Sequence, residues 1–183
     1  LDGSLPVTSG EVILDNNLLN IAAIDVELEQ VSCKVEFVNG KVSGQAVTGQ
    51  LFNQPVAIDF VTKPMGKDYG VEIDLAAKWH SDKIPDDWHQ YVDDYLAGEV
   101  DWQGKVILKI MEDDVAYQAN IKSPMTGLAF KLPKPLDKYV DQQEQLSIST
   151  AGNIRGGQFN LGLGSRAEVL ARFEIDDGLQ VPE

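Results

Sequence analysis

Residues 98–122 decide the fold class of this chain. They run Gly98-Glu-Val-Asp-Trp-Gln-Gly-Lys-Val-Ile-Leu-Lys-Ile-Met-Glu-Asp-Asp-Val-Ala-Tyr-Gln-Ala-Asn-Ile-Lys122, with apolar side chains at alternate positions on both sides of the acidic residues 112–114. Because successive side chains of a strand point to opposite faces, this pattern predicts a β-hairpin with one apolar and one polar face. Residues 127–132 predict another short strand, which Pro133 and Pro135 end because proline has no N–H to donate to a neighbouring strand.

The same alternation recurs along most of the chain. It is clearest in Val71–Trp79 and in the run from Phe159 to Ile175, where the apolar residues occupy odd positions. Asn39-Gly40 lies between two alternating runs, which predicts a tight hairpin, and Asp15-Asn-Asn predicts a turn between two shorter strands. We therefore expect ten to twelve strands joined as an antiparallel meander.

Periodicity alone does not separate a closed barrel, a two-layer sandwich and an open curved half-pipe, since each has strands with one apolar face. Glycines inside the predicted strands (Gly44, Gly49, Gly104 and Gly162) favour a strongly curved sheet, although they also fit strand ends and irregularities. The predicted fold is mainly β, an antiparallel and strongly curved meander that forms an open half-pipe or taco-like sheet.

One short amphipathic helix is predicted near residues 86–97. Pro85 precedes it, and Gly98 suits the position just after a helix end. Because its apolar stripe is too aromatic to be left in water, we expect it to cover the sheet or an open edge. The stripe consists of Trp88, Tyr91, Val92, Tyr95 and Leu96.

Composition excludes several classes of function. The chain has 183 residues and a formal net charge of -14, which disfavours nucleic-acid binding and docking on anionic lipid headgroups. The single cysteine, Cys33, rules out an intrachain disulfide, and no apolar run approaches the length of a membrane span. The chain starts at Leu1 rather than Met, so we expect residues 1–183 to be a single β-rich segment excised from a longer protein.

No constellation of residues predicts catalysis, a metal or a cofactor. His80 and His89 lack a second histidine or cysteine at ligand spacing, and the paired aspartates do not follow the pattern of a calcium loop. The hydrolase motif Gly-Xaa-Ser-Xaa-Gly does not occur. We therefore expect no enzymatic activity. The aromatic residues of the middle third have two interpretations, the domain's own core or an apolar surface offered to a ligand.

The central stretch also carries a family resemblance. The segments Leu96-Ala-Gly-Glu-Val-Asp-Trp-Gln-Gly-Lys-Val and Leu128-Ala-Phe-Lys-Leu-Pro-Lys-Pro-Leu-Asp-Lys resemble the YhdP family of AsmA-like envelope proteins. Leu28-Glu-Gln-Val-Ser-Cys-Lys-Val-Glu-Phe-Val-Asn-Gly is similar to its strand-turn pattern, although Cys33 stands where that family is expected to have glycine. The likeness covers most of residues 10–175.

The resemblance implies a bridge-like lipid carrier. Such proteins are anchored by an N-terminal helix in the inner membrane of Gram-negative bacteria. Their long periplasmic β-structure encloses a groove along which phospholipids pass toward the outer membrane and support its permeability barrier. This chain would be one internal periplasmic segment, and its partners would be phospholipid or another acyl-chain ligand and the neighbouring β-segments of the same protein. The groove candidates are Val71, Ile73, Leu75, Val106, Leu108, Ile110, Phe159, Leu161 and Leu163.

Two other functions fit the same sequence. A structural or protein-interaction module would present an apolar edge or helix face to a neighbouring segment, or to an identical chain through self-association of the fragment. A carbohydrate-binding β-protein would need tryptophans and carboxylates that converge in one cleft. Neither alternative involves a cofactor.

Overall fold

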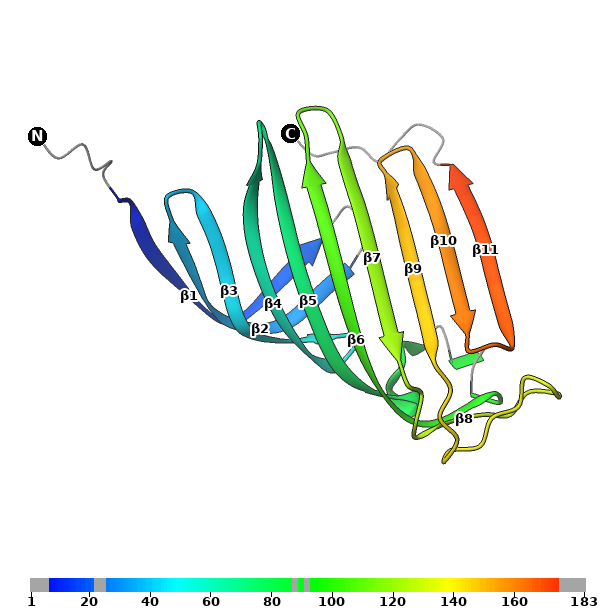
Figure 1. Cartoon of the computed structure of the whole chain (residues 1–183). Helices are drawn as coiled ribbons and strands as arrows, with labels where there is room; N and C mark the ends of the chain where they lie inside the picture. Colours follow the sequence, from blue (N-terminus) through cyan, green and yellow to red (C-terminus); the bar gives the residue numbers. More distant parts are fainter. Residues whose placement is uncertain (1–6, 22–25, 87–88, 91–92, 175–183) are drawn as a thin grey trace, which may run out of the picture.

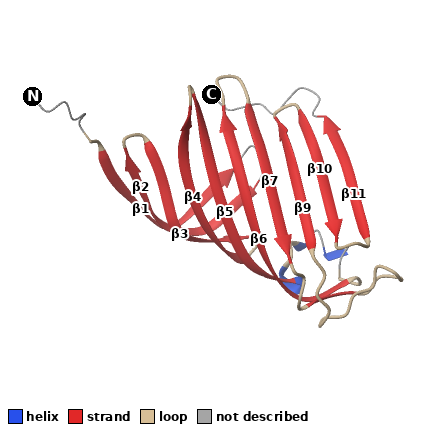
Figure 2. Cartoon of the chain, viewed as in Figure 1, coloured by secondary structure: helices blue, strands red, loops and turns tan. Residues whose placement is uncertain are grey.

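The computed structural model describes residues 7–21, 26–86, 89–90 and 93–174, and nearly all of them belong to one antiparallel sheet (Figure 1). Figure 2 shows how little helix accompanies it. The strands are β1 (Ser9–Ile21), β2 (Val26–Val38), β3 (Lys41–Leu51), β4 (Gln54–Met65), β5 (Asp68–His80), β6 (Leu96–Ile110), β7 (Val115–Ser123), β8 (Leu128–Phe130), β9 (Leu146–Asn153), β10 (Gly156–Leu163) and β11 (Ala167–Glu174).

The sheet is an open meander. Its strand order is β1-β2-β3-β4-β5-β6-β7-β9-β10-β11, so each strand pairs with its neighbour in sequence except where β8 leaves the path. The short β8 pairs with the beginning of β6 instead. Since β1 and β11 end the path and do not pair with each other, the sheet is neither a closed barrel nor a two-sheet sandwich. The predicted fold class is confirmed.

Tight turns follow the local chemistry of the sequence. Asn39 and Gly40 both have positive φ, 49° and 78°, and Val38 pairs with Lys41 across them. This is the predicted two-residue hairpin, in which the backbone twist of the turn matches that of the strands. The next hairpin turns at Phe52 and Asn53, with φ of 53° and 59°.

The predicted turn at residues 15–17 is wrong. β1 continues through it to Ile21, and the extra residues form a bulge at Asn16, which has φ of 53°. A second bulge follows Gly44 in β3, where Ala46 has φ of 51°. Bulges bend a strand and increase its twist. In Figure 1 the lower halves of β1 and β2 accordingly swing behind β4–β6, which gives the sheet its curvature.

The predicted helix ends too late. Helical residues occur at Asp86, His89 and Gln90, but Tyr95 lies in an exposed turn and Leu96 already begins β6. The cause is the pairing of Leu96–Gly98 with β8, which holds these residues extended. The other residues of the predicted stripe, Trp88, Tyr91 and Val92, lie outside the described residues.

Two apolar clusters hold the described part of the chain together. The larger joins side chains of β2, β3, β4 and β6, so one face of the curved sheet packs against itself. The smaller joins Met125 and Leu128, from the connection between β7 and β9, to Leu163 of β10. We call this connection, residues 124–145, the strap.

Candidate functional site

One face of the sheet is apolar along its whole width. The cross-strand partners form an unbroken row with one residue from each strand of the path, and residues directly opposite in an antiparallel pair share a face. Thr150 is the one polar residue of this row. The row is Val12, Val35, Gly44, Phe60, Ile73, Val106, Ala119, Thr150, Phe159 and Ala171.

All predicted groove residues lie on this apolar face. Ile73, Val106 and Phe159 belong to the row itself. The others lie an even number of residues from them along β5, β6 or β10, and every second residue of a strand shares a face. They are Leu75, Leu161 and Leu163 toward one end of the strands, and Val71, Leu108 and Ile110 toward the other. Their contact with lipid stays a prediction.

Burial changes along the strands. Near the β3–β4 turn the apolar face is closed, since Val47, Val56 and Trp102 are between 3% and 8% exposed. At the opposite end Ile110 and Phe173 are 44% and 40% exposed. The folded sheet therefore packs its apolar face shut along one margin and leaves it partly open along the other.

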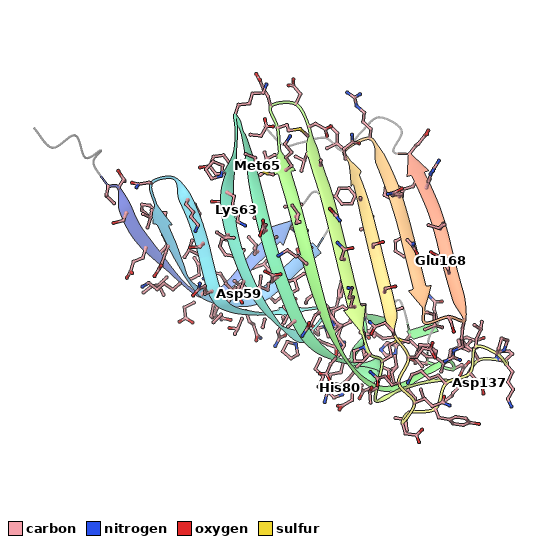
Figure 3. All side chains as sticks on the ribbon, in the orientation of Figure 1. Asp59, Lys63, Met65, His80, Asp137 and Glu168 are labelled. Atoms are coloured by element: carbon pink, nitrogen blue, oxygen red, sulfur yellow. The ribbon has the colours of Figure 1, made fainter. Side chains whose placement is uncertain are left out.

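The opposite face is polar and carries ion pairs. Lys63 Nζ lies 2.7 Å from Glu72 Oε1, and Lys105 Nζ lies 3.3 Å from Asp74 Oδ1. The hydrogen bond from Lys63 lowers the pKa of the Glu72 carboxyl. Figure 3 shows the side chains of this face, with Asp59, Lys63 and Glu168 labelled. A charged outer face keeps the sheet hydrated while its other face stays apolar.

Tryptophans form the closed margin. The rings of Trp79 and Trp102 meet edge to face with centroids 5.1 Å apart, and Phe52 meets Trp79 at 5.9 Å. Gln54 is fully buried beside them, and its side-chain oxygen accepts a hydrogen bond from His80 N at 2.6 Å. Among the described residues, the indole N–H groups of both tryptophans and the Gln54 amide nitrogen are buried without a partner. Of the two interpretations of the aromatic residues, core packing therefore applies to Trp79 and Trp102.

The strap is the feature that the sequence pattern did not reveal. Lys138 is 2% exposed, and its Nζ donates to the carbonyl oxygens of Leu128 at 2.6 Å and Tyr139 at 3.2 Å. Burial lowers the pKa of this ammonium group. Arg166, between β10 and β11, donates to the Pro135 and Asp137 carbonyls and to the Glu144 carboxylate. The Leu-Pro-Lys-Pro-Leu-Asp-Lys motif thus ends in a buried cation.

The described part of the chain offers little for chemistry. No group of three or more histidine, cysteine or acidic side chains there is placed to hold a metal ion. His89 Nδ1 lies 2.7 Å from Asp93 Oδ1, an exposed contact whose hydrogen bond raises the pKa of the imidazole. Burial raises the pKa of the Cys33 thiol, which disfavours the reactive thiolate.

This chain matches a protein-family model and is similar to a named protein. The family model described as YhdP protein matches residues 2–183. This chain belongs to the YhdP family. Over 158 residues it is 31% identical to the intermembrane phospholipid transporter YhdP of Escherichia coli (strain K12), a match that covers 84% of this chain and 12% of that protein. The chain therefore spans a small part of the relative's length. No solved structure matches it. In the described ranges, no helix of this YhdP-family chain has the length and apolar character of a membrane span.

Proposed function

We propose that this chain is a non-catalytic segment of a phospholipid transporter, and that its apolar face forms part of a groove for acyl chains moving between the inner and outer membranes. One observation carries the proposal: the row of apolar residues that crosses the sheet from β1 to β11 without a charged side chain. An acyl chain forms no hydrogen bonds, so it is held by burial alone, at about 0.8 kcal/mol per CH₂ group.

Movement along such a face needs contacts of similar strength at each step. Across β5, β6, β7 and β10 the row presents Ile73, Val106, Ala119 and Phe159, which differ in size but not in polarity. A sliding chain would exchange one apolar contact for another. The one polar side chain in the row is that of Thr150 on β9, and its hydroxyl donates to Gln158 O at 3.0 Å. The partly exposed margin near Ile110 leaves room for a headgroup to stay in water while the tails lie against the face.

The match covers only 12% of the E. coli relative, which supports a path built from successive β-segments of one long chain. β1 and β11 are the edges of the described sheet, and each carries backbone groups able to pair with a further strand. We place neighbouring β-segments of the same protein at these edges, so that the apolar face continues from segment to segment. The proposed setting is the periplasm, with the protein anchored in the inner membrane outside this segment.

Site-specific photocrosslinking tests the proposal. A photoreactive amino acid at Leu108 should capture phospholipid, whereas the same group at Ile107 should not. The two positions are adjacent in β6 and both half-buried, but they lie on opposite faces, with Leu108 opposite Val71 and Ile107 opposite Glu72. Equal capture at both positions, or none at Leu108 when the full-length protein is tested in cells, would contradict the groove.

The exposed edges also favour a second candidate function, a structural module that pairs with other β-segments or with a second copy. Ile13 of β1 is 72% exposed, and Leu170 of β11 is 74% exposed. If pairing were the only role, the isolated chain would self-associate in analytical ultracentrifugation and retain no phospholipid. A strict monomer that retains lipid would exclude this alternative.

A further inference from the structure

The strap occupies the apolar face rather than the outside of the sheet. Met125, Leu128 and Phe130 of the strap form one cluster with Leu146, Leu163 and Ala167, which lie side by side on β9, β10 and β11. These three sheet residues continue the next row of the face, Ile148, Leu161 and Val169. The chain therefore places its own apolar side chains where the proposed path would otherwise continue.

The strap is largely closed on itself. Its two ends are joined by a hydrogen bond from Glu144 N to Pro124 O, at 3.1 Å. Inside it, Phe130 and Lys138 exchange backbone hydrogen bonds in both directions, at 2.9 and 3.1 Å. The buried ammonium of Lys138 also binds carbonyls of the strap itself. A unit with this much internal bonding can move as a whole without losing its own structure.

The hydrogen bonds that join the strap to the sheet gather mainly on two sides. On one side β8 pairs with Leu96–Gly98 at the beginning of β6, and Glu99 N and Lys131 N donate to Gly127 O and Tyr95 O at the same contact. On the other side Gly164 N donates to Gln145 O, and the Arg166 side chain binds the carbonyls of Pro135 and Asp137 and the carboxylate of Glu144.

We propose that the strap is a displaceable cover, latched by Arg166, over a further acyl-chain site formed by Leu146, Leu163 and Ala167. This site deepens the proposed function and rests on it. When the strap is seated, acyl chains are confined to the rows nearer the open margin. When Arg166 releases it, the face extends to the lower ends of β9, β10 and β11.

Thiol labelling measures displacement without any lipid. In a Cys33→Ala background, single cysteines replace Ala167, which the strap partly covers, or Ala171, which lies two rows away on the same face of β11 and is exposed. Adding Arg166→Ala should raise the maleimide reaction rate at position 167 by about tenfold or more, equivalent to about 1.4 kcal/mol of latch free energy. The rate at position 171 should not change.

Arg172→Ala is the matched control, because it removes an arginine from the outer face of the same strand and should alter neither rate. No acceleration at position 167, or equal acceleration at both positions, would overturn the latch. Amide exchange in the unmodified chain is an independent measurement. The amides of Lys131 and Gly164 donate across the boundary of the strap, to Tyr95 O and Gln145 O, so they should exchange together and before those of β5. If these two amides exchange as slowly as those of β5, the displaceable cover is refuted.

A lipid experiment separates this inference from the proposed function. Ala97 and Ala129 lie directly opposite in the β6–β8 pair, where Cα atoms are about 4.5–5.5 Å apart, a spacing that a disulfide spans. Cysteines there pin the strap when oxidised and free it when reduced. With vesicles of phosphatidylethanolamine and phosphatidylglycerol carrying a fluorescent phospholipid, the reduced form should extract more lipid. Equal extraction would overturn the cover alone, and no extraction by either form would overturn the proposed function, with thiol labelling still deciding whether the strap moves.

Discussion

Replacing Gly98 with alanine should detach β8 from β6. Gly98 has φ of 117°, and a Cβ atom there would lie only 2.1 Å from the carbonyl oxygen of Gly127. An L-residue in such a conformation costs about 1–3 kcal/mol. Separating the strands also loses the bonds from Glu99 N to Gly127 O and from Lys131 N to Tyr95 O, each with a net value of about 1 kcal/mol. We expect Gly98→Ala to lower the free energy of unfolding by about 3–5 kcal/mol.

Gly66→Ala is the matched control. Gly66 also has positive φ, 73°, but nothing lies within 4 Å of its Cβ position, so only backbone strain of about 1–2 kcal/mol applies. Urea unfolding measures the free energy of unfolding of both variants. In thermal unfolding, the Gly98 variant should melt on the order of 10 °C below the parent chain. Amide exchange should localise the loss to residues 95–99 and 127–131. If the two variants are equally stable, the close approach of β6 and β8 is not what Gly98 provides.

Three further outcomes are expected. Trp102→Ala should lower the free energy of unfolding by about 3–5 kcal/mol. Trp102→Phe should lower it far less, because it keeps a ring and removes a buried N–H without a partner. Equal losses for the two variants in urea unfolding would mean that this N–H is hydrogen-bonded in solution. Because the pKa of Lys138 is lowered in the folded chain, the unfolded chain binds more protons between that lowered value and 10.5. The free energy of unfolding should therefore rise with pH across this window, and Lys138→Met should abolish that rise. The pKa of Glu72 is lowered by Lys63, so this pair should stabilise the fold above pH 4.5 and lose its effect as pH falls through the lowered pKa; Lys63→Gln should remove that dependence, and high salt should weaken it.

Local sequence chemistry accounts for much of the fold. The alternation in Val71–Trp79, around residues 98–122 and in the run from Phe159 placed every groove candidate on one face, because the strand period of two is independent of which strands pair. Asn39-Gly40 specified its hairpin for a similarly local reason, since both residues tolerate positive φ. The turn predicted at Asp15-Asn-Asn was wrong, because the residues that favour a turn also tolerate a bulge inside a continuous strand.

The end of the predicted helix shows where local information fails. Gly98 suits the position after a helix and also the close approach of two backbones, and only the presence of β8 at this place selects the second role. The Leu-Pro-Lys-Pro-Leu-Asp-Lys segment is similar, because two prolines and two lysines in a polar stretch are typical of an exposed loop. The burial of Lys138 depends on carbonyl oxygens that the path of the strap brings together.

By itself, the sequence of this chain determined that it forms antiparallel strands with one apolar and one polar face, because the alternation of side chains along a strand is a local property of the sequence. Its motifs also indicated the YhdP family, which the family match over residues 2–183 confirmed. Only the tertiary structure decided that the sheet stays open, that its apolar face closes on itself at Trp102, and that the strap lies on that face under Arg166. These features depend on contacts between residues far apart in the chain, and no local pattern specifies such contacts.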